Sequence, residues 1–363
     1  MKVALLSFDF GEYCVRLASA LAREAEVSLL LPDRQVASYL PKLERSVRLH
    51  PFGKPRLRQP LQQIGMIRAN LARIRQFDPD VLHIQQGHLW FNLALPLLSR
   101  YPLVLTVHDP LHHLGDEGAQ RTPQAVMHYG FRRARRIVVH SQRLRRVVVD
   151  RCRIAERIVD VIPHIALGDE PVEAQPREEG RLVLFFGRIW AYKGLEYLIR
   201  AAPRITAELP DARIVIAGEG EDFARYRRMI VNPDHFIVRN EYVPDEARTE
   251  LFRRASVVVL PYVEASQSGV IPLAYRFGKP VVATTVGGLP EMVDHGRTGL
   301  LVPPRDERAL AEAVVRILSD DGLRRRLGAA GQRKLESECA PAAVASQTLE
   351  VYRRALNRDE SAP

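Results

Sequence analysis

Short apolar runs alternate with helical patterns along the first half of the chain. The runs at residues 3–8, 27–31, 81–84, 103–107 and 137–139 are rich in Val, Leu and Ile. Continuous apolar runs of this length are typical of strands that are buried on both faces of a parallel sheet. Helical patterns between most of them give the βα repetition that such a sheet requires.

The same alternation restarts in the second half. Between the two series, residues 166–180 contain Gly168, Pro171, Pro176 and several acids without apolar periodicity, which indicates a linker. Residues 307–357 carry Leu, Ala, Arg and Lys at helical spacing, with a break at Pro341. The apolar runs of this half lie at residues 182–186, 213–217, 236–238, 257–260, 281–283 and 299–302.

The pattern therefore predicts an α/β protein with two Rossmann-like, doubly wound parallel-sheet domains. The expected divisions are an N-terminal domain at 1–165, a linker at 166–180, a C-terminal domain at 181–340 and a final helix at 341–363 that returns toward the N-terminal domain. Ligands of open α/β sheets bind beyond the carboxyl ends of the strands. Two such sheets facing one another would share a cleft, where we expect the active site.

Composition agrees with an ordinary globular protein. The chain has 363 residues, 46% of them hydrophobic and 26% charged, which suits two domains with a core each. No apolar run approaches the roughly 20 residues of a membrane-spanning helix. The start MKVALLSF reads as a first strand and not as a signal peptide. Cys14, Cys152 and Cys339 are odd in number and far apart, so we expect no disulfide framework, no zinc site and a cytoplasmic protein.

Positive charge is concentrated in the N-terminal half. Residues 1–165 hold 25 Lys or Arg against 14 Asp or Glu, whereas the remainder holds 28 against 29. This asymmetry favours a partner with phosphate groups or an anionic membrane surface. Nucleic acid is not expected, because no recognisable motif accompanies the charge. The two dense clusters are Arg45, Arg48, Lys54, Arg56 and Arg58, and then Arg132, Arg133, Arg135, Arg136, Arg143, Arg145 and Arg146.

Residues 61–77 have two interpretations. Ile64, Ile67, Leu71 and Ile74 lie at helical spacing beside several arginines. Such a segment is either an amphipathic helix on a membrane surface or an ordinary packed helix with a solvated basic side, and the second interpretation is favoured.

The segment FFGRIWAYKG has the chemistry of a diphosphate site. A strand ends at Phe186, Gly187 and Arg188 follow, and Lys193 and Gly194 open a helix. Arginine gives forked hydrogen bonds to phosphate oxygens, lysine gives a mobile point charge, and a helix N-terminus adds unpaired N–H groups. A strand-end arginine and an exposed helix lysine without a ligand are the alternative.

The phrases GRxxxxKG, FGKPVVAT, GGLPE and GxTGLLVPPxD follow one another across the second half. In these the sequence resembles the family 4 glycosyltransferases, retaining enzymes of the GT-B architecture. The N-terminal match is thinner and rests on Gly11 with Glu12 and on TVHD at residues 106–109.

The resemblance implies roles for individual residues. Arg188 and Lys193 would hold the diphosphate of a nucleotide sugar, and His108 would contact the donor sugar. Gly11, in a flexible first loop with Glu12, would lie near the phosphates and the acceptor. For His108 a core histidine is the alternative, and for Gly11 a simple loop glycine. The nucleobase would lie against backbone near Val243, which leaves UDP, GDP and ADP sugars open.

One loop departs from the family. Many members carry two glutamates eight positions apart, and the corresponding positions here are Ala265 and Leu273. Leu273 cannot accept a ribose hydrogen bond, so ribose recognition must differ, and Glu264 becomes the candidate carboxylate at the sugar. Small polar side chains and backbone N–H groups suit phosphate and sugar hydroxyls, although a solvated turn is the alternative. The further donor-binding candidates are Gly187, Ser266, Gln267, Ser268, Gly269, Val270, Gly288 and Glu291.

The expected reaction is sugar transfer from a nucleotide diphosphate to a hydroxyl acceptor. Similar bacterial enzymes act on lipid-linked or membrane-embedded glycans, so a peripheral position on the inner face of the plasma membrane is expected. No metal or other cofactor is needed, because Arg188 and Lys193 neutralise the leaving diphosphate. A sugar-nucleotide epimerase of the same fold and a catalytically silent homologue are the alternatives.

Overall fold

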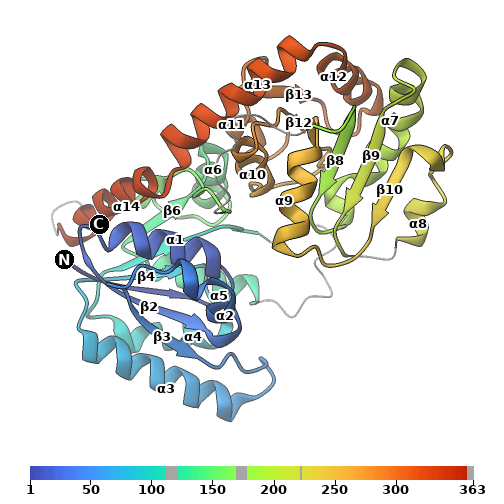
Figure 1. Ribbon diagram of the computed structural model, residues 1–363. Helices are drawn as coiled ribbons and strands as arrows, with labels where there is room; N and C mark the ends of the chain where they lie inside the picture. Colours follow the sequence, from blue (N-terminus) through green and yellow to red (C-terminus); the bar gives the residue numbers. More distant parts are fainter. Residues whose placement is uncertain (112–121, 169–177, 221–222, 358–363) are drawn as a thin grey trace. The chain divides into compact units, whose positions relative to one another are not determined.

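The computed structural model describes residues 1–111, 122–168, 178–220 and 223–357, which form two compact units (Figure 1). Unit 1 comprises residues 1–111, 122–165 and 338–357, and unit 2 comprises residues 166–168, 178–220 and 223–337. Most of the expected linker, residues 169–177, and the last residues, 358–363, lie outside the described part of the chain.

Unit 1 contains a seven-stranded sheet whose strands are all parallel, in the order β3-β2-β1-β4-β5-β6-β7. All five runs expected as strands in this half are strands. Two further strands, β3 and β7, were not predicted. The bounds are β1 Lys2–Ser7, β2 Glu26–Pro32, β3 Arg48–Phe52, β4 Val81–Gln85, β5 Leu103–Thr106, β6 Arg136–Val139 and β7 Val159–Val161.

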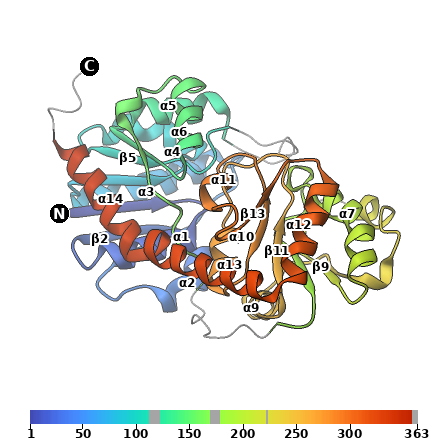
Figure 2. The same cartoon turned by 90° about the horizontal axis from the view of Figure 1, so that it is seen from above.

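Helices cover both faces of this sheet. Apolar side chains of α3, α4 and α5 build the core on one face, and α14 packs beside α1 on the other (Figure 2). The last helix of the chain therefore belongs to unit 1. The bounds are α1 Gly11–Leu21, α2 Asp33–Tyr39, α3 Pro60–Phe77, α4 Leu89–Ala94, α5 Gln124–Arg133, α6 Gln142–Asp150 and α14 Pro341–Leu356.

A buried ion pair joins β6, β7 and α14. Arg136 donates from Nε and Nη2 to the two carboxylate oxygens of Asp160 at 2.8 and 2.7 Å. Arg354 of α14 adds a contact of 2.9 Å to the same carboxylate. Arg136 is thus not part of an exposed basic cluster, because its strand faces the interior and its charge is used within the fold.

Unit 2 contains a six-stranded parallel sheet in the order β10-β9-β8-β11-β12-β13. Every run expected as a strand in this half is a strand. The bounds are β8 Leu182–Phe186, β9 Arg213–Ala217, β10 Phe236–Arg239, β11 Val257–Leu260, β12 Val281–Thr284 and β13 Gly299–Val302.

The helices of unit 2 also lie on both faces, with α7 and α9 on opposite sides of the sheet in Figure 1. A π-helical turn at Leu335–Cys339 follows the last of them. The bounds are α7 Leu195–Glu208, α8 Ala224–Arg227, α9 Asp245–Arg254, α10 Val270–Arg276, α11 Leu289–Met292, α12 Glu307–Ser319 and α13 Asp321–Lys334.

The prediction of two doubly wound parallel-sheet units is confirmed. In each sheet the strand order reverses once, between β1 and β4 in unit 1 and between β8 and β11 in unit 2. Such a reversal leaves a crevice beyond the carboxyl ends of the two strands, which is where open α/β sheets bind ligands.

Candidate functional site

The two cations of the diphosphate motif follow β8, at the reversal point of the sheet in unit 2. Arg188 is exposed, and the described residues offer it no ion-pair partner. Lys193 ends a 3₁₀ turn, Ala191–Lys193, and is half-buried. Its ammonium lies 3.8 Å from the ring centroid of Tyr262, a residue of the loop after β11. The loops after β8 and β11 therefore meet at a cation–π contact.

Tyr262 connects these loops through its side chain. It is buried, and its hydroxyl lies 3.3 Å from the hydroxyl of Ser268. Burial raises the pKa of Tyr262 to about 12, while the hydrogen bond with Ser268 and the positive charge of Arg188 act in the opposite direction. Lys193 therefore lies against this ring, and Arg188 contributes to the electrostatic surroundings of its hydroxyl.

Backbone contacts hold the loops together. The N–H of Val263 donates to the Tyr192 carbonyl at 2.8 Å, and that of Gly288 to the Ser266 carbonyl at 3.1 Å. Gly194 and Gly287 both have positive φ, +64° and +56°. A Cβ on Gly194 would lie 2.0 Å from the Pro261 carbonyl oxygen, and one on Gly287 would lie 1.5 Å from that of Ala265. Glycine is therefore required where the loops after β8 and β12 approach the loop after β11.

This packing predicts opposite effects for two glycine substitutions. Gly287→Ala should lower the free energy of unfolding by about 2 kcal/mol or more, because left-handed backbone costs about 1–2 kcal/mol and the Cβ meets a carbonyl. Gly65→Ala, in α3 with nothing within 4 Å of the added Cβ, should raise it by about 0.5–1 kcal/mol. Urea unfolding measures both. Equal effects of the two substitutions would contradict the close approach at Gly287.

The other donor-binding candidates lie in these loops or at the same edge of the sheet. Glu264 is half-buried next to Tyr192, whose carbonyl its N–H faces at 3.4 Å. Val243 follows β10, the edge strand, and is half-buried. Leu273 is buried in α10, with an exposed fraction of 5%. Ser266 and Ser268 are buried, Gly269 and Val270 are half-buried, and Glu291 is exposed.

Two buried polar atoms in these loops have no hydrogen-bond partner. They are Nε1 of Trp190, in the loop after β8, and Oε1 of Gln267, in the loop after β11. An unpaired buried donor or acceptor costs about 1–3 kcal/mol. One is a donor and the other an acceptor, so a bound ligand with hydroxyl groups could satisfy both.

The first loop of unit 1 differs from the expectation. Gly11 is the first residue of α1 and is buried, not part of a flexible loop. A Cβ there would lie 2.9 Å from atoms of Gln35 in α2, so glycine allows the two helices to approach. Glu12 is half-buried and forms an ion pair of 3.1 Å with Arg16.

His108 follows β5 and is completely buried. Phe10 stacks on its ring, with centroids 3.8 Å apart. Its Nε2 lies 2.9 Å from Gln85 Oε1 and its Nδ1 3.2 Å from His140 Nε2. A direct contact with a donor sugar would therefore require Phe10 to leave the ring face, and this role stays a prediction.

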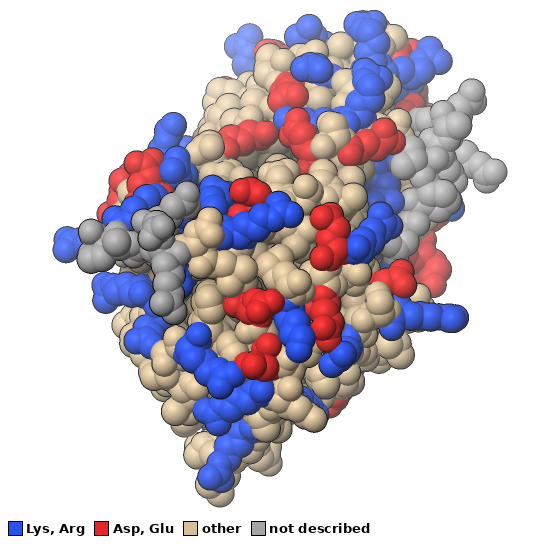
Figure 3. Space-filling model, turned by 90° about the vertical axis from the view of Figure 1, so that its left-hand side faces the viewer, with Lys and Arg blue, Asp and Glu red and all other residues tan. Residues whose placement is uncertain are grey.

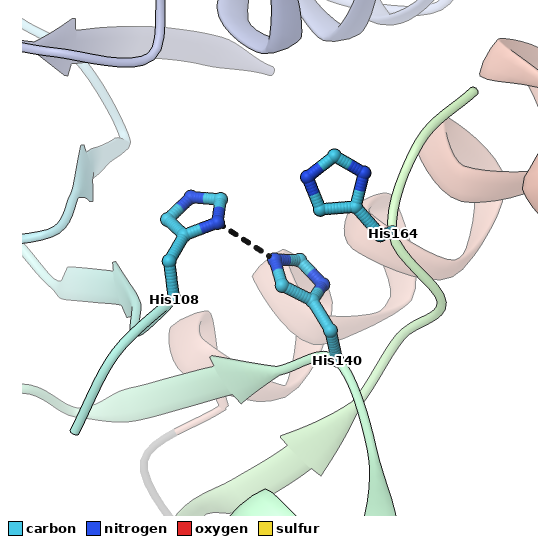
Figure 4. A group of neighbouring side chains, drawn as sticks. All are labelled: His108, His140 and His164. Carbon is cyan, nitrogen blue, oxygen red and sulfur yellow. Dashed lines mark hydrogen bonds between the residues drawn. The ribbon is translucent and has the colours of Figure 1, made fainter. Parts of the chain in front are cut away.

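His140 and His164 complete a group of three buried histidines with His108 (Figure 4). His140 follows β6, and His164 lies three residues after β7. Burial lowers the pKa of His140 to about 3 and that of His164 to about 4, and it lowers the pKa of His108 as well. The three imidazoles are therefore neutral at physiological pH.

Sequence reasoning missed this group, together with Tyr262 and Trp190. A signal was present, because each histidine comes directly after or shortly after an apolar strand run, in TVHD, IVVHS and VIPHI. Parallel strands end at one edge of a sheet, so residues in these places come together.

Two family models cover most of the chain. The model described as Glycosyltransferase Family 4 matches residues 11–165, and the one described as Glycosyl transferases group 1 matches residues 180–320. Each match corresponds to one of the two parallel-sheet units.

Named relatives agree with these matches. The chain is 30% identical to the glycogen synthase of Mycobacterium tuberculosis over 321 residues, which are 82% of this chain and 75% of that protein. It is 33% identical to an uncharacterized glycosyltransferase of Methanocaldococcus jannaschii over 183 residues, 50% of this chain and 46% of that protein. Anabaena HepE, solved in complex with UDP-glucose, superposes with a TM-score of 0.75 at 17% identity and covers 98% of this chain and 100% of its own. The chain therefore belongs to the family 4 glycosyltransferases and has the GT-B fold of two Rossmann-like units.

Proposed function

We propose that this glycosyltransferase moves a sugar from a nucleotide-diphosphate sugar to a hydroxyl acceptor with retention of anomeric configuration, in the cytoplasm. No metal ion would bridge the diphosphate. The observation that carries the proposal is that Arg188 and Lys193 both lie in the short segment after β8, at the reversal point of the sheet in unit 2, with Lys193 against the ring of Tyr262.

Arg188 and Lys193 would bind the diphosphate and stabilise the charge that develops on it as the glycosidic bond breaks. A guanidinium without a partner among the described residues is available for forked hydrogen bonds to phosphate oxygens. Helix α7 begins at Leu195, two residues after Lys193, with Gly194 as its N-cap and no side-chain cap. Its first N–H groups therefore add a further site for negative charge.

The sugar and ribose would lie along the loop after β11. The carboxylate of Glu264 would bind the sugar. The amide oxygen of Gln267 is buried without a hydrogen-bond partner and would accept a hydrogen bond from a hydroxyl group of the donor. Because Leu273 is buried and apolar, we assign ribose recognition to the polar groups of Ser266, Gln267 and Ser268. His108 remains the proposed sugar contact in unit 1, after a movement of Phe10.

We further propose a lipid-linked or membrane-associated acceptor. Residues 67, 71 and 74 of α3 pack into the core, but Leu61 and Ile64 are 83% and 45% exposed, on one helix face with the exposed Arg68. Figure 3 shows many Lys and Arg side chains on one face of the molecule, with Asp and Glu among them. Apolar and basic groups together suit an anionic lipid surface. None of the described helices is long and apolar enough to span a bilayer.

The test is a panel of radiolabelled UDP, GDP and ADP sugars, with and without membrane lipid extract and with and without added Mg²⁺ or Mn²⁺. We expect label to move from one donor to the lipid fraction without added divalent ions. The anomeric configuration of the product, compared with that of the donor by NMR, tests retention.

Each other outcome contradicts a stated part of the proposal. Interconversion of free nucleotide sugars would identify an epimerase, and binding without turnover a silent homologue. Transfer only to water-soluble acceptors would overturn the lipid acceptor, and activity only with added divalent ions would overturn the metal-free donor site.

A further inference from the structure

We propose that His108, His140 and His164 form a binding site for one transition-metal ion of the Zn²⁺ class inside unit 1. The three residues follow β5, β6 and β7, which are neighbours in the sheet. One ring nitrogen of each lies within 4.8 Å of those of the other two. Figure 4 shows these nitrogens on the sides of the rings that face one another.

In each ring, the nitrogen that points away from the other two histidines lies within hydrogen-bond distance of an oxygen acceptor. Nε2 of His108 lies 2.9 Å from Gln85 Oε1. Nδ1 of His140 lies 3.0 Å from the Ile162 carbonyl oxygen, and Nδ1 of His164 lies 2.8 Å from the Ile165 carbonyl oxygen. Each ring is therefore a neutral tautomer that donates outward and points a lone pair inward. An N–H donated to a carbonyl or amide oxygen is the usual support of a histidine metal ligand.

The nitrogens that face one another are Nδ1 of His108, Nε2 of His140 and Nε2 of His164, and with these tautomers each has a lone pair that can bind a cation. His108 Nδ1 and His140 Nε2 lie 3.2 Å apart, and both are lone-pair acceptors in the tautomers given above. The described residues supply no hydrogen-bond donor to His164 Nε2. The competing arrangement turns the Gln85 amide so that it donates to His108 Nε2, which allows Nδ1–H of His108 to donate to His140. That arrangement needs no ion, and metal binding decides between the two.

Aromatic rings and two carboxylates surround the three histidines. Phe10 stacks on His108, and Tyr13 meets the rings of His108 and His164 edge-on at 5.2 and 5.1 Å. Two carboxylates act electrostatically on the group, Asp109 on His140 and Glu12 on His164. Asp109 offsets part of the cost of burying a positive ion among neutral ligands, whereas the charge of Glu12 is already paired with Arg16.

Three imidazoles select the kind of ion. Imidazole nitrogen suits Zn²⁺, Ni²⁺, Co²⁺ and Cu²⁺, whereas Mg²⁺ and Ca²⁺ prefer oxygen ligands. Three protein ligands leave a fourth position of a tetrahedral zinc for water. The ion would fix the carboxyl ends of three strands in unit 1. It would also occupy Nδ1 of His108, so it would compete with the sugar contact proposed for that residue, whereas the diphosphate site proposed in unit 2 does not involve it.

The test is direct metal binding to tag-free protein, because a polyhistidine tag would itself bind zinc. After equilibration with Zn²⁺ and removal of free ion, we expect one zinc per chain by elemental analysis. His140→Ala and His164→Ala should each raise the Kd by about 100-fold or more, beyond the effect of losing an outer-shell partner. His128→Ala, a half-buried histidine of α5 outside the group, should bind zinc as the wild type does.

A second measurement uses Co²⁺, whose visible spectrum reports tetrahedral nitrogen coordination and does not depend on transferase activity. Circular dichroism selects folded variants, and His164→Gln replaces His164→Ala where the smaller side chain prevents folding. Folded wild-type protein without stoichiometric zinc would overturn the inference. Zinc binding of unchanged affinity in folded His140 and His164 variants would overturn it as well.

Discussion

Arg188→Ala and Lys193→Ala should each lower kcat for sugar transfer by about 100- to 1,000-fold, the usual effect of removing one pre-positioned donor from a developing anion. Neither side chain is buried in the core, so the free energy of unfolding should change little for Arg188→Ala and by no more than about 2 kcal/mol for Lys193→Ala, which loses the contact with Tyr262. Steady-state transfer of radiolabelled sugar, measured with the donor that the panel identifies, gives the effect. Arg188→Lys should recover only part of the rate, because an ammonium lacks the forked geometry of a guanidinium.

Arg200→Ala is the matched control. Arg200 lies on α7, at most two turns from the motif, and forms an exposed ion pair with Glu196 at 3.6 Å. Its removal changes the same net charge without touching the proposed phosphate contacts, so kcat should remain near that of the wild type. Rates of Arg188→Ala or Lys193→Ala within twofold of this control would refute the assignment.

Asp160→Ala should lower the free energy of unfolding by about 3–5 kcal/mol, the cost of breaking a buried ion pair by removing one partner. Arg136 and Asp160 have exposed fractions of only 8% and 7%, so Arg136 would be left as an uncompensated buried charge. This is a large part of the roughly 5–15 kcal/mol by which domains are usually stable. Urea unfolding followed by circular dichroism measures the change.

Two further variants test the cause. Arg136→Met combined with Asp160→Leu removes both buried charges and should be more stable than Asp160→Ala, because only Arg354, whose side chain is 36% exposed, then loses a partner. Glu350→Ala removes an exposed partner of Arg353 on α14 and should cost less than about 1 kcal/mol. An equal decrease in the free energy of unfolding for Asp160→Ala and Glu350→Ala would show that the Arg136–Asp160 pair contributes no more than an exposed ion pair.

The sequence predicted the strands that are buried on both faces, because continuous apolar runs have few other interpretations. It missed β3 and β7 for a physical reason. β3, RLHPF, lies at the sheet edge, is partly exposed and contains Pro51. β7 has three residues and carries Asp160, whose charge is compensated by Arg136 from the neighbouring strand. Edge position and long-range pairing are invisible in local patterns.

The candidate site shows the same division between local and long-range signals. Arg188, Lys193 and the loop around Glu264 were selected as candidates because each belongs to one continuous motif. Tyr262, whose ring lies against the ammonium of Lys193, is an unremarkable residue after an apolar run. His140 and His164 become candidates only because they lie beside His108. The register of β5, β6 and β7 brings the three together, and this register cannot be inferred from the local sequence.

The last helix sets a condition on how unit 1 forms. Tyr352 of α14 is completely buried, and its hydroxyl lies 2.6 Å from Nδ1 of His83 in β4, a strand made some 269 residues earlier in the chain. During synthesis, one face of the sheet of unit 1 therefore lacks helix α14 until nearly all of unit 2 has left the ribosome. A fragment that ends between the two sheets would consequently lack helix α14. Joining residues 338–357 to residues 1–165 would restore this helix to unit 1.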